Sequence, residues 1–252
     1  MITPFYLCGF PKAGLHMVEQ AMSVFASPIA KNNWVGTTAW RGEIAFPETM
    51  LEAALTLAPG TYAKGHAAYT AELEQRFYSL GIGFVFVYRD LRDVVVSQAN
   101  HILRAEGEKL KHPGADLYRA MDSYEDILIA IIEGLNEYVG IFERWELFAG
   151  WLRCGWIFPV RYEDMRRRDK ATCRDLYEYA LSINPEMRQP ITPEDATNEM
   201  VARVRNRKNS VTFYKGKIGG WEKSFTPRVV DCFKAHDPGW LAELKYAKDN
   251  NW

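Results

Sequence analysis

The chain has 252 residues, of which 48% are hydrophobic and 25% charged, and its formal net charge is -1 at pH 7. This length and composition suffice to bury a full core, so an intrinsically disordered chain is excluded. The near-neutral charge argues against a general nucleic-acid-binding protein.

Four short apolar segments are predicted to be strands. They span Phe5–Phe10, Thr61–Lys64, Phe84–Tyr88 and Trp156–Tyr162. Runs of this length, bounded by glycines or turn residues, are typical of buried strands. Pro159 lies inside the last one, which indicates an edge strand or a bulge because proline cannot donate a ladder hydrogen bond.

Helical spacing of apolar residues predicts helices between these strands. One starts at Leu15, a second runs from about Leu91 to Leu103, and a third is expected over the whole of Tyr124–Ala149. Strands that alternate with helices favour a three-layer α/β/α fold with a central parallel sheet. We expect one domain over residues 1–252.

Two stretches, about 31–47 and 105–123, lack a clear period and are expected to be loops over a pocket. The alternative is that they are ordinary surface connections. Their aromatic residues favour a pocket with apolar walls for a small-molecule acceptor; these are Trp34, Trp40, Phe46 and Tyr118.

The first strand leads through a short loop into a helix, and that place attracts anions because backbone N–H groups and the helix dipole face it. The loop residues are Pro11, Lys12, Ala13, Gly14, Leu15 and His16. Lys12 adds a full charge, and Gly14 permits close approach of a ligand. Leu15 and His16 stand where a nucleotide P-loop has its metal-binding hydroxyl. The pattern predicts a phosphate-like group bound without a metal; a plain strand-to-helix turn is the alternative.

Arg89 follows the Phe84–Tyr88 strand, at the strand end where ligands of open α/β sheets bind. Ser97 lies on the following helix. A guanidinium and a hydroxyl both suit a phosphate. The alternative is a salt-bridged helix start, in which Asp90 and Asp93 pair with Arg89 and Arg92.

The segment Arg203–Lys223 holds seven Lys or Arg residues against one acid, Glu222. Its glycines permit close backbone approach, so it could fold over a highly charged ligand. A solvated basic loop is the alternative.

His66 follows Lys64 and Gly65 after the short second strand. An imidazole there could act as a general base near its own pKa. Most single histidines are structural, and that interpretation stays open here.

In this order, the motifs resemble those of the PAPS-dependent sulfotransferases, over about Phe5 to Phe233. They are Phe-Pro-Lys-Ala-Gly, Lys-Gly-His, Tyr-Arg-Asp-Leu-Arg-Asp-Val-Val-Val-Ser, Arg-Tyr-Glu-Asp and Lys-Gly-Lys-Ile-Gly-Gly-Trp. The resemblance implies a P-loop-like α/β fold and the donor 3′-phosphoadenosine 5′-phosphosulfate (PAPS), with 3′-phosphoadenosine 5′-phosphate (PAP) as product.

The resemblance also implies roles for residues. Pro11–His16 would hold the 5′-phosphosulfate, with Lys12 catalytic. His66 would be the base, and Lys64 would assist near the sulfuryl group. The 3′-phosphate would contact Arg89, Ser97 and the loop of Tyr214, Lys215 and Gly216, and Tyr162 would lie by the adenine.

The sequence departs from the family pattern in several places. Many members of the family have two hydroxyl residues after the glycine of the anion loop, and this chain has Leu15 and His16 there. Met17 takes the place of the family's adenine-stacking tryptophan. Tyr214 replaces an arginine, and Gly220 replaces an aspartate. The dimerisation signature is degraded at Glu222, Pro227 and Asp231, so no oligomeric state is predicted.

We therefore expect sulfuryl transfer to a hydroxyl or amine of a small molecule, without a metal. The alternatives are a metal-dependent kinase of P-loop type and a non-catalytic nucleotide-binding protein. The cysteines form no CxxC pair and are expected to be buried thiols; they are Cys8, Cys154, Cys173 and Cys232. No signal peptide or membrane span is visible, so a soluble cytoplasmic protein is expected.

Overall fold

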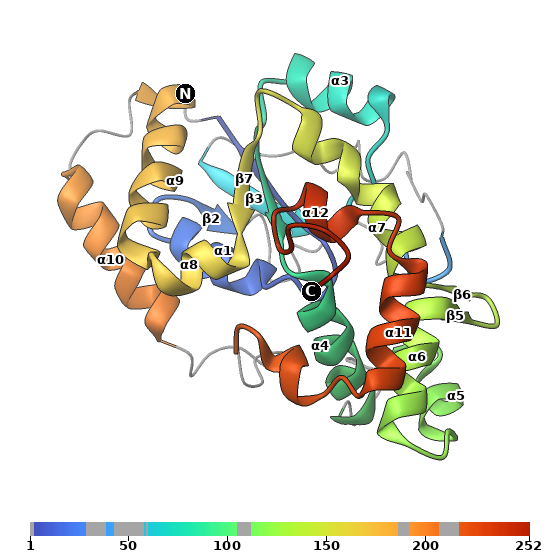
Figure 1. Cartoon of the computed structure of the whole chain (residues 1–252). Coiled ribbons are helices and arrows are strands. Elements are labelled where there is room, and N and C mark those ends of the chain that lie inside the picture. The colour runs from blue at the N-terminus through green and yellow to red at the C-terminus, as the bar shows by residue number, and fades with distance from the viewer. Residues whose placement is uncertain are drawn as a thin grey trace. The chain divides into compact units, whose positions relative to one another are not determined.

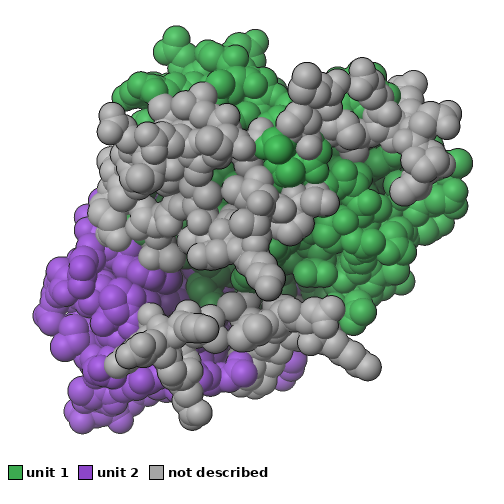
Figure 2. All heavy atoms as spheres, turned by 180° about the vertical axis from the view of Figure 1, so that it is seen from behind, with its two compact units in different colours: residues 1–39, 44–89, 147–213 green, residues 40–43, 90–146, 214–252 purple. Residues whose placement is uncertain are grey.

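The structure is a computed structural model that describes residues 3–28, 39–42, 58, 60–104, 112–185, 192–206 and 217–252. The chain divides into two compact units, which Figure 2 shows in different colours. Unit 1 consists of residues 1–39, 44–89 and 147–213. Unit 2 consists of residues 40–43, 90–146 and 214–252.

A five-stranded, all-parallel sheet forms the centre of unit 1, in the order β2-β3-β1-β4-β7. Its strands are β1 (Phe5–Gly9), β2 (Ser27–Pro28), β3 (Thr61–Gly65), β4 (Gly83–Tyr88) and β7 (Phe158–Arg161). β1 and five of the six residues of β4 are buried, as expected of central strands covered on both faces. β7 lies at the edge, where the proline predicted it.

Helices cover both faces of this sheet. Successive residues of β1 point to opposite faces. On one face Phe5 packs near Phe25, which in turn contacts Tyr177 of α9 (Asp169–Ile183). On the other face Tyr6 packs against Phe77 of α3 (Ala71–Ser79). The predicted α/β/α layering is thereby confirmed.

The other helices among the described residues of unit 1 are α1 (Leu15–Met22), α8 (Tyr162–Arg167) and α10 (Pro193–Arg205), together with the short 3₁₀ helix η2 (Gly150–Arg153). α10 packs on α9 and α1, and these helices lie on one side of the sheet in Figure 1.

Unit 2 is mainly helical. Its elements are α4 (Leu91–Arg104), α5 (Ala115–Arg119), α6 (Tyr124–Glu133), the hairpin of β5 (Gly134–Leu135) and β6 (Tyr138–Val139), η5 (Gly220–Lys223), α11 (Pro227–His236) and α12 (Trp240–Glu243). α7 (Ile141–Ala149) begins in unit 2 and ends in unit 1. α6 packs against α4 and α11.

The single helix predicted over Tyr124–Ala149 is wrong. Gly134 has a φ of 100° and Asn136 a φ of 52°, which ends α6 and turns the chain into the β5–β6 hairpin. A Cβ atom at Gly140 would lie 2.4 Å from the carbonyl oxygen of Ile132, so this return path requires glycine. The spacing of apolar residues alone does not reveal these backbone turns.

Two smaller expectations also need correction. The stretch 105–123, predicted as a loop, contains helix α5, and Tyr118 on it is buried beside the rings of His112 and Tyr138. All four cysteines are free thiols, but Cys154 and Cys232 are only partly buried. No helix in the described part of the chain is long and apolar enough to cross a membrane.

Candidate active site

Four chemistry-bearing segments follow the carboxyl ends of parallel strands in unit 1. The loop of Lys12 follows β1, His66 follows β3, Arg89 follows β4 and Tyr162 follows β7. The register pairs Cys8 with Gly65, and Gly9 with Val87. Since parallel strands end at the same edge of a sheet, the topology brings these segments to one edge, as the sequence predicted.

The loop after β1 makes a tight turn into α1. The N–H of Ala13 donates to the carbonyl of Phe10 at 3.0 Å, and Gly14 is the N-cap of α1 with a φ of 100°. Lys12 has a φ of 68°, which is uncommon for a non-glycine residue and is often found at functional sites. Pro11, Ala13 and Leu15 are buried, so the loop is a packed part of the fold.

The ring of Tyr162 packs against this loop. A Cβ atom at Gly14 would lie 2.6 Å from Cδ2 of that ring, so only glycine allows the approach. The guanidinium of Arg89 lies over the same ring, 4.2 Å from its centroid. Arg89 and Tyr162 are 7% and 5% exposed. Tyr162 thus links the anion loop to Arg89 and holds both, a role the sequence did not predict for it.

His66 is buried, and its Nδ1 lies 2.5 Å from the carbonyl oxygen of Gly9. A carbonyl can only accept, so Nδ1 carries the proton and the basic lone pair belongs to Nε2. The segment after His66 is fixed as well, because the indole N–H of Trp151 donates to the Ala67 carbonyl at 2.8 Å. This tautomer and this anchoring suit a general base.

Lys64 forms an ion pair with Glu19 of α1. The other carboxylate oxygen of Glu19 lies 3.1 Å from Nδ1 of His16, and Oε1 accepts a hydrogen bond from the Tyr62 hydroxyl at 3.4 Å. Burial alone would raise the pKa of the Glu19 carboxyl, but the hydrogen bonds and charges of His16 and Lys64 outweigh it and lower that pKa to about 2. Glu19 is therefore an anion at neutral pH.

The other predicted donor-binding residues belong to unit 2 or lie outside the described residues. Ser97 is half-buried on α4 in unit 2. Tyr214, Lys215 and Gly216 lie outside the described residues, as do Trp34 and Phe46.

Unit 2 connects two of the sequence motifs. The carboxylate of Asp93 accepts hydrogen bonds from the backbone N–H groups of Gly219 (3.0 Å) and Trp221 (3.1 Å). Arg92 pairs with Asp90 and lies 4.0 Å from the ring centroid of Trp221. The alternative of a salt-bridged helix start is thus correct for Arg92 and Asp90, and Asp93 anchors the glycine-rich segment.

Sequence reasoning missed Glu19 and the anchoring role of Asp93. The spacing of His16 and Glu19, three residues apart on a helix, could have indicated their pairing. The partners Lys64 and Gly219 are distant in sequence, so no local pattern signals them.

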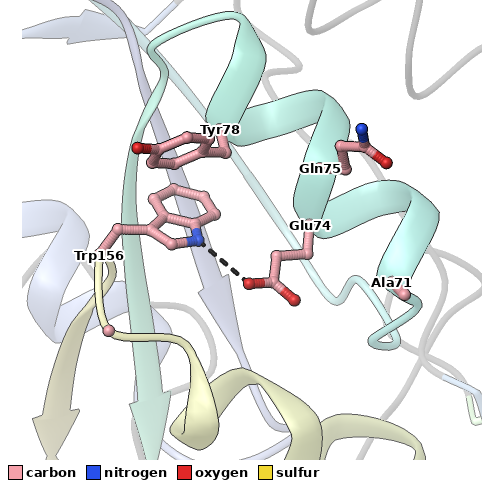
Figure 3. A pocket seen from close by; sticks show the side chains of 6 residues that line it. Ala71, Glu74, Gln75, Tyr78 and Trp156 are labelled. Atoms are coloured by element: carbon pink, nitrogen blue, oxygen red, sulfur yellow. Dashed lines mark hydrogen bonds between the residues drawn. The ribbon is translucent and has the colours of Figure 1, made fainter.

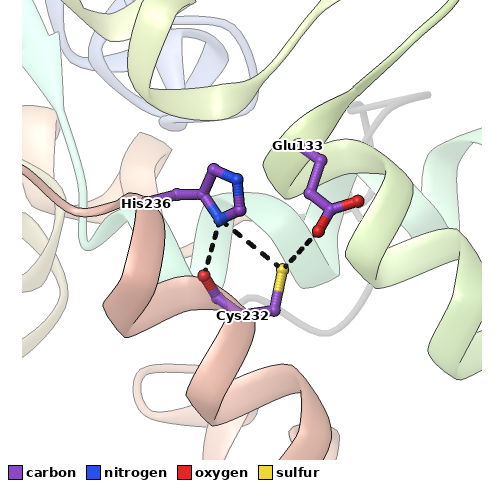
Figure 4. Close-up of side chains that lie close together, drawn as sticks. All are labelled: Glu133, Cys232 and His236. Carbon is purple, nitrogen blue, oxygen red and sulfur yellow. Dashed lines mark hydrogen bonds between the residues drawn. The ribbon is translucent and has the colours of Figure 1, made fainter.

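Two other side-chain clusters involve none of the predicted site residues. A hollow of about 520 Å³ in unit 1 has Tyr78 and Trp156 at its wall, and the Trp156 indole donates to Glu74 (Figure 3). In unit 2, Glu133, Cys232 and His236 lie close together (Figure 4), and these residue types can hold a metal ion. Burial, and then the Glu133 carboxylate, raise the pKa of the Cys232 thiol to about 12, which disfavours the thiolate a metal needs.

The chain is similar to known proteins in sequence and in fold. The sulfotransferase domain model matches residues 3–243. The fold is similar to a crystal structure of mouse sulfotransferase SULT7A1 complexed with PAP, with a TM-score of 0.59 and 14% identity over 98% of this chain and 86% of that one. It is also similar to retinol dehydratase in complex with androsterone and PAP, with a TM-score of 0.53 and 12% identity over 95% and 80% of the two chains. No curated protein sequence matches the chain.

Proposed function

Since the chain belongs to the sulfotransferase family, we propose that it moves a sulfuryl group from PAPS to a hydroxyl or amine of a small molecule. His66 is the general base in this proposal. The observation that carries it is the His66 side chain, whose Nδ1–H donates to Gly9 and thereby leaves the basic lone pair on Nε2.

The proposed reaction is a single in-line displacement. The acceptor oxygen or nitrogen forms a bond to sulfur as the bond from sulfur to the 5′-phosphate oxygen breaks, and Nε2 of His66 takes the acceptor proton. Lys12 stabilises the charge that develops on the leaving oxygen, and PAP leaves. Lys64 steadies the sulfuryl oxygens. The two relatives of similar fold were solved with PAP, which supports this donor.

The donor carries several negative charges, and the proposed cationic groups suit them. Pro11–His16 receive the 5′-phosphosulfate at the N-terminus of α1. Arg89, Ser97 and the Tyr214–Gly216 segment receive the 3′-phosphate, and Tyr162 lies by the adenine. Leu15 and His16 supply no hydroxyl for Mg²⁺, so the reaction is proposed to need no metal.

His66→Ala tests the base. General-base catalysis is worth about 10²–10⁴ in rate, so we expect kcat to fall by that factor while PAP affinity stays within about twofold. The measurement combines transfer of labelled sulfate from PAPS to a panel of phenols, alcohols, amines and sugars with calorimetric titration of PAP. An equal loss of PAP affinity would assign His66 a structural role instead.

A metal-dependent kinase is the competing activity, because it shares a parallel sheet and an anion loop. Sulfuryl transfer from PAPS that persists in EDTA supports the proposed sulfotransferase activity. Phosphoryl transfer from ATP that is abolished by EDTA would instead support a kinase. A non-catalytic nucleotide-binding protein would bind PAP but transfer no sulfate to any acceptor in the panel.

A further inference from the structure

Glu19 places a negative charge beside the loop that is proposed to hold an anionic donor. It lies on the second turn of α1, whose N-terminus that loop forms. Its side chain is 13% exposed, and the Lys64 side chain is 14% exposed. A partly buried carboxylate close to a site for anions is electrostatically unfavourable for binding, so its presence calls for a reason.

The contacts of Glu19 supply that reason. One carboxylate oxygen binds the ammonium of Lys64, and the other lies 3.1 Å from the His16 ring. Lysine has four rotatable side-chain bonds, and an ion pair fixes its ammonium at one point. The Tyr62 hydroxyl also donates to Glu19, which holds the carboxylate itself in place.

A purely structural ion pair is a weaker explanation. Two charges removed from water gain little net stability, because the desolvation penalty offsets much of the attraction. An ion pair between Glu19 and Lys64 would not require further polar partners, yet the Glu19 carboxylate also contacts His16 and Tyr62.

We propose that Glu19 is a positioning residue that holds Lys64 and His16 in place beside the donor loop, at a cost in affinity for the anionic nucleotide. This inference rests on the proposed function. It assigns Glu19 opposite effects on two quantities: it speeds transfer and weakens nucleotide binding.

Glu19→Gln tests both effects, because it removes the charge and keeps the size. We expect the Kd of PAP to decrease by about 3- to 10-fold, because one repulsive negative charge is lost. We expect kcat with PAPS to fall about 10-fold or more, since Lys64 is no longer fixed. Unchanged kcat, or PAP binding that weakens along with kcat, overturns the inference.

Glu19→Asp distinguishes the effect of the Glu19 charge from the effect of its carboxylate position. It also tests the inference if the Glu19→Gln variant does not fold. It keeps the charge but shortens the reach, so kcat should fall while the Kd of PAP stays within about twofold; tighter PAP binding by this variant contradicts the proposal. The matched control is Glu72→Gln, which removes an exposed carboxylate paired with Arg76 on α3. It should change neither quantity.

The design distinguishes two kinds of failure. If the wild-type chain binds PAP but transfers no sulfate, the proposed function fails, and the PAP titrations still decide whether Glu19 weakens nucleotide binding. If transfer is present and Glu19→Gln binds PAP no more tightly, the inference alone fails. If the wild-type chain binds no PAP, both the proposed function and the inference about Glu19 are wrong.

Discussion

At the residue scale, the anion loop depends on backbone geometry as much as on charge. Lys12 and Gly14 both have positive φ values, 68° and 100°. The left-handed region costs a non-glycine residue about 1–3 kcal/mol, so the surrounding packing must impose it on Lys12. At Gly14 the ring of Tyr162 occupies the space that a side chain would need. The packing of Tyr162 and the two positive φ values thus hold the loop in a specific backbone conformation.

Gly14→Ala is expected to lower the free energy of unfolding by about 2–4 kcal/mol and to weaken PAP binding, because it combines a strained φ with a clash against Tyr162. Gly60→Ala is the matched control: Gly60 has a φ of 74°, and a Cβ atom there would meet nothing within 4 Å. The Gly60→Ala variant should lose only about 1 kcal/mol of the free energy of unfolding. Urea denaturation with PAP titration measures both. Equal losses for the two variants would show that the Tyr162 contact is unimportant.

At the element scale, unit 2 joins the start of α4 to the glycine-rich segment before η5. Asp93 is 2% exposed and accepts from two backbone N–H groups of that segment. Arg92, one residue earlier, packs against the rings of Trp221 and Trp252. Arg92 and Asp93 of the Tyr-Arg-Asp-Leu-Arg-Asp motif thus contact Gly219 and Trp221 of the Lys-Gly-Lys-Ile-Gly-Gly-Trp motif.

Asp93→Ala leaves two N–H groups without their charged acceptor, and hydrogen bonds to charged groups are worth about 1.5–3 kcal/mol each. We expect a loss of about 2–4 kcal/mol in the free energy of unfolding and faster tryptic cleavage at Lys217 and Lys223. Asp116→Ala is the control, since that carboxylate is 75% exposed. Cleavage that is no faster than in the wild type would argue against the anchoring role.

At the scale of the whole molecule, the proposed donor should stabilise the folded chain. A ligand that binds only the folded state at 100 times its Kd adds about 2.7 kcal/mol to the free energy of unfolding. PAP is expected to do so at a concentration where AMP, which lacks the 3′-phosphate, has a much smaller effect. Arg89→Ala should remove most of this difference.

Thermal denaturation with each nucleotide, with and without EDTA, measures this linkage. EDTA should not alter the stabilisation by PAP. Equal stabilisation by AMP and PAP in the wild-type chain would mean that the 3′-phosphate is not recognised, and the roles proposed for Arg89 and Ser97 would be wrong.

Much of this molecule was predictable because its information is local. Short runs rich in apolar residues predict strands, so β1, β4 and β7 were predicted to within about two residues at each end, and the shorter Thr61–Lys64 segment matches β3. The alternation of strands and helices then determines a parallel layered sheet, and its topology brings Lys12, His66 and Arg89 to one edge.

What could not be predicted depends on distances between segments that are remote in sequence. The Tyr124–Ala149 stretch has helical spacing throughout, yet positive φ values at Gly134 and Asn136 turn it back on itself. Glu19 pairs with Lys64, which is 45 residues away in the sequence, and Asp93 accepts from Gly219, which is 126 residues away. Periodicity states which side of an element is apolar, but the partner of a buried charge is chosen by packing and desolvation, which exist only once the chain has folded.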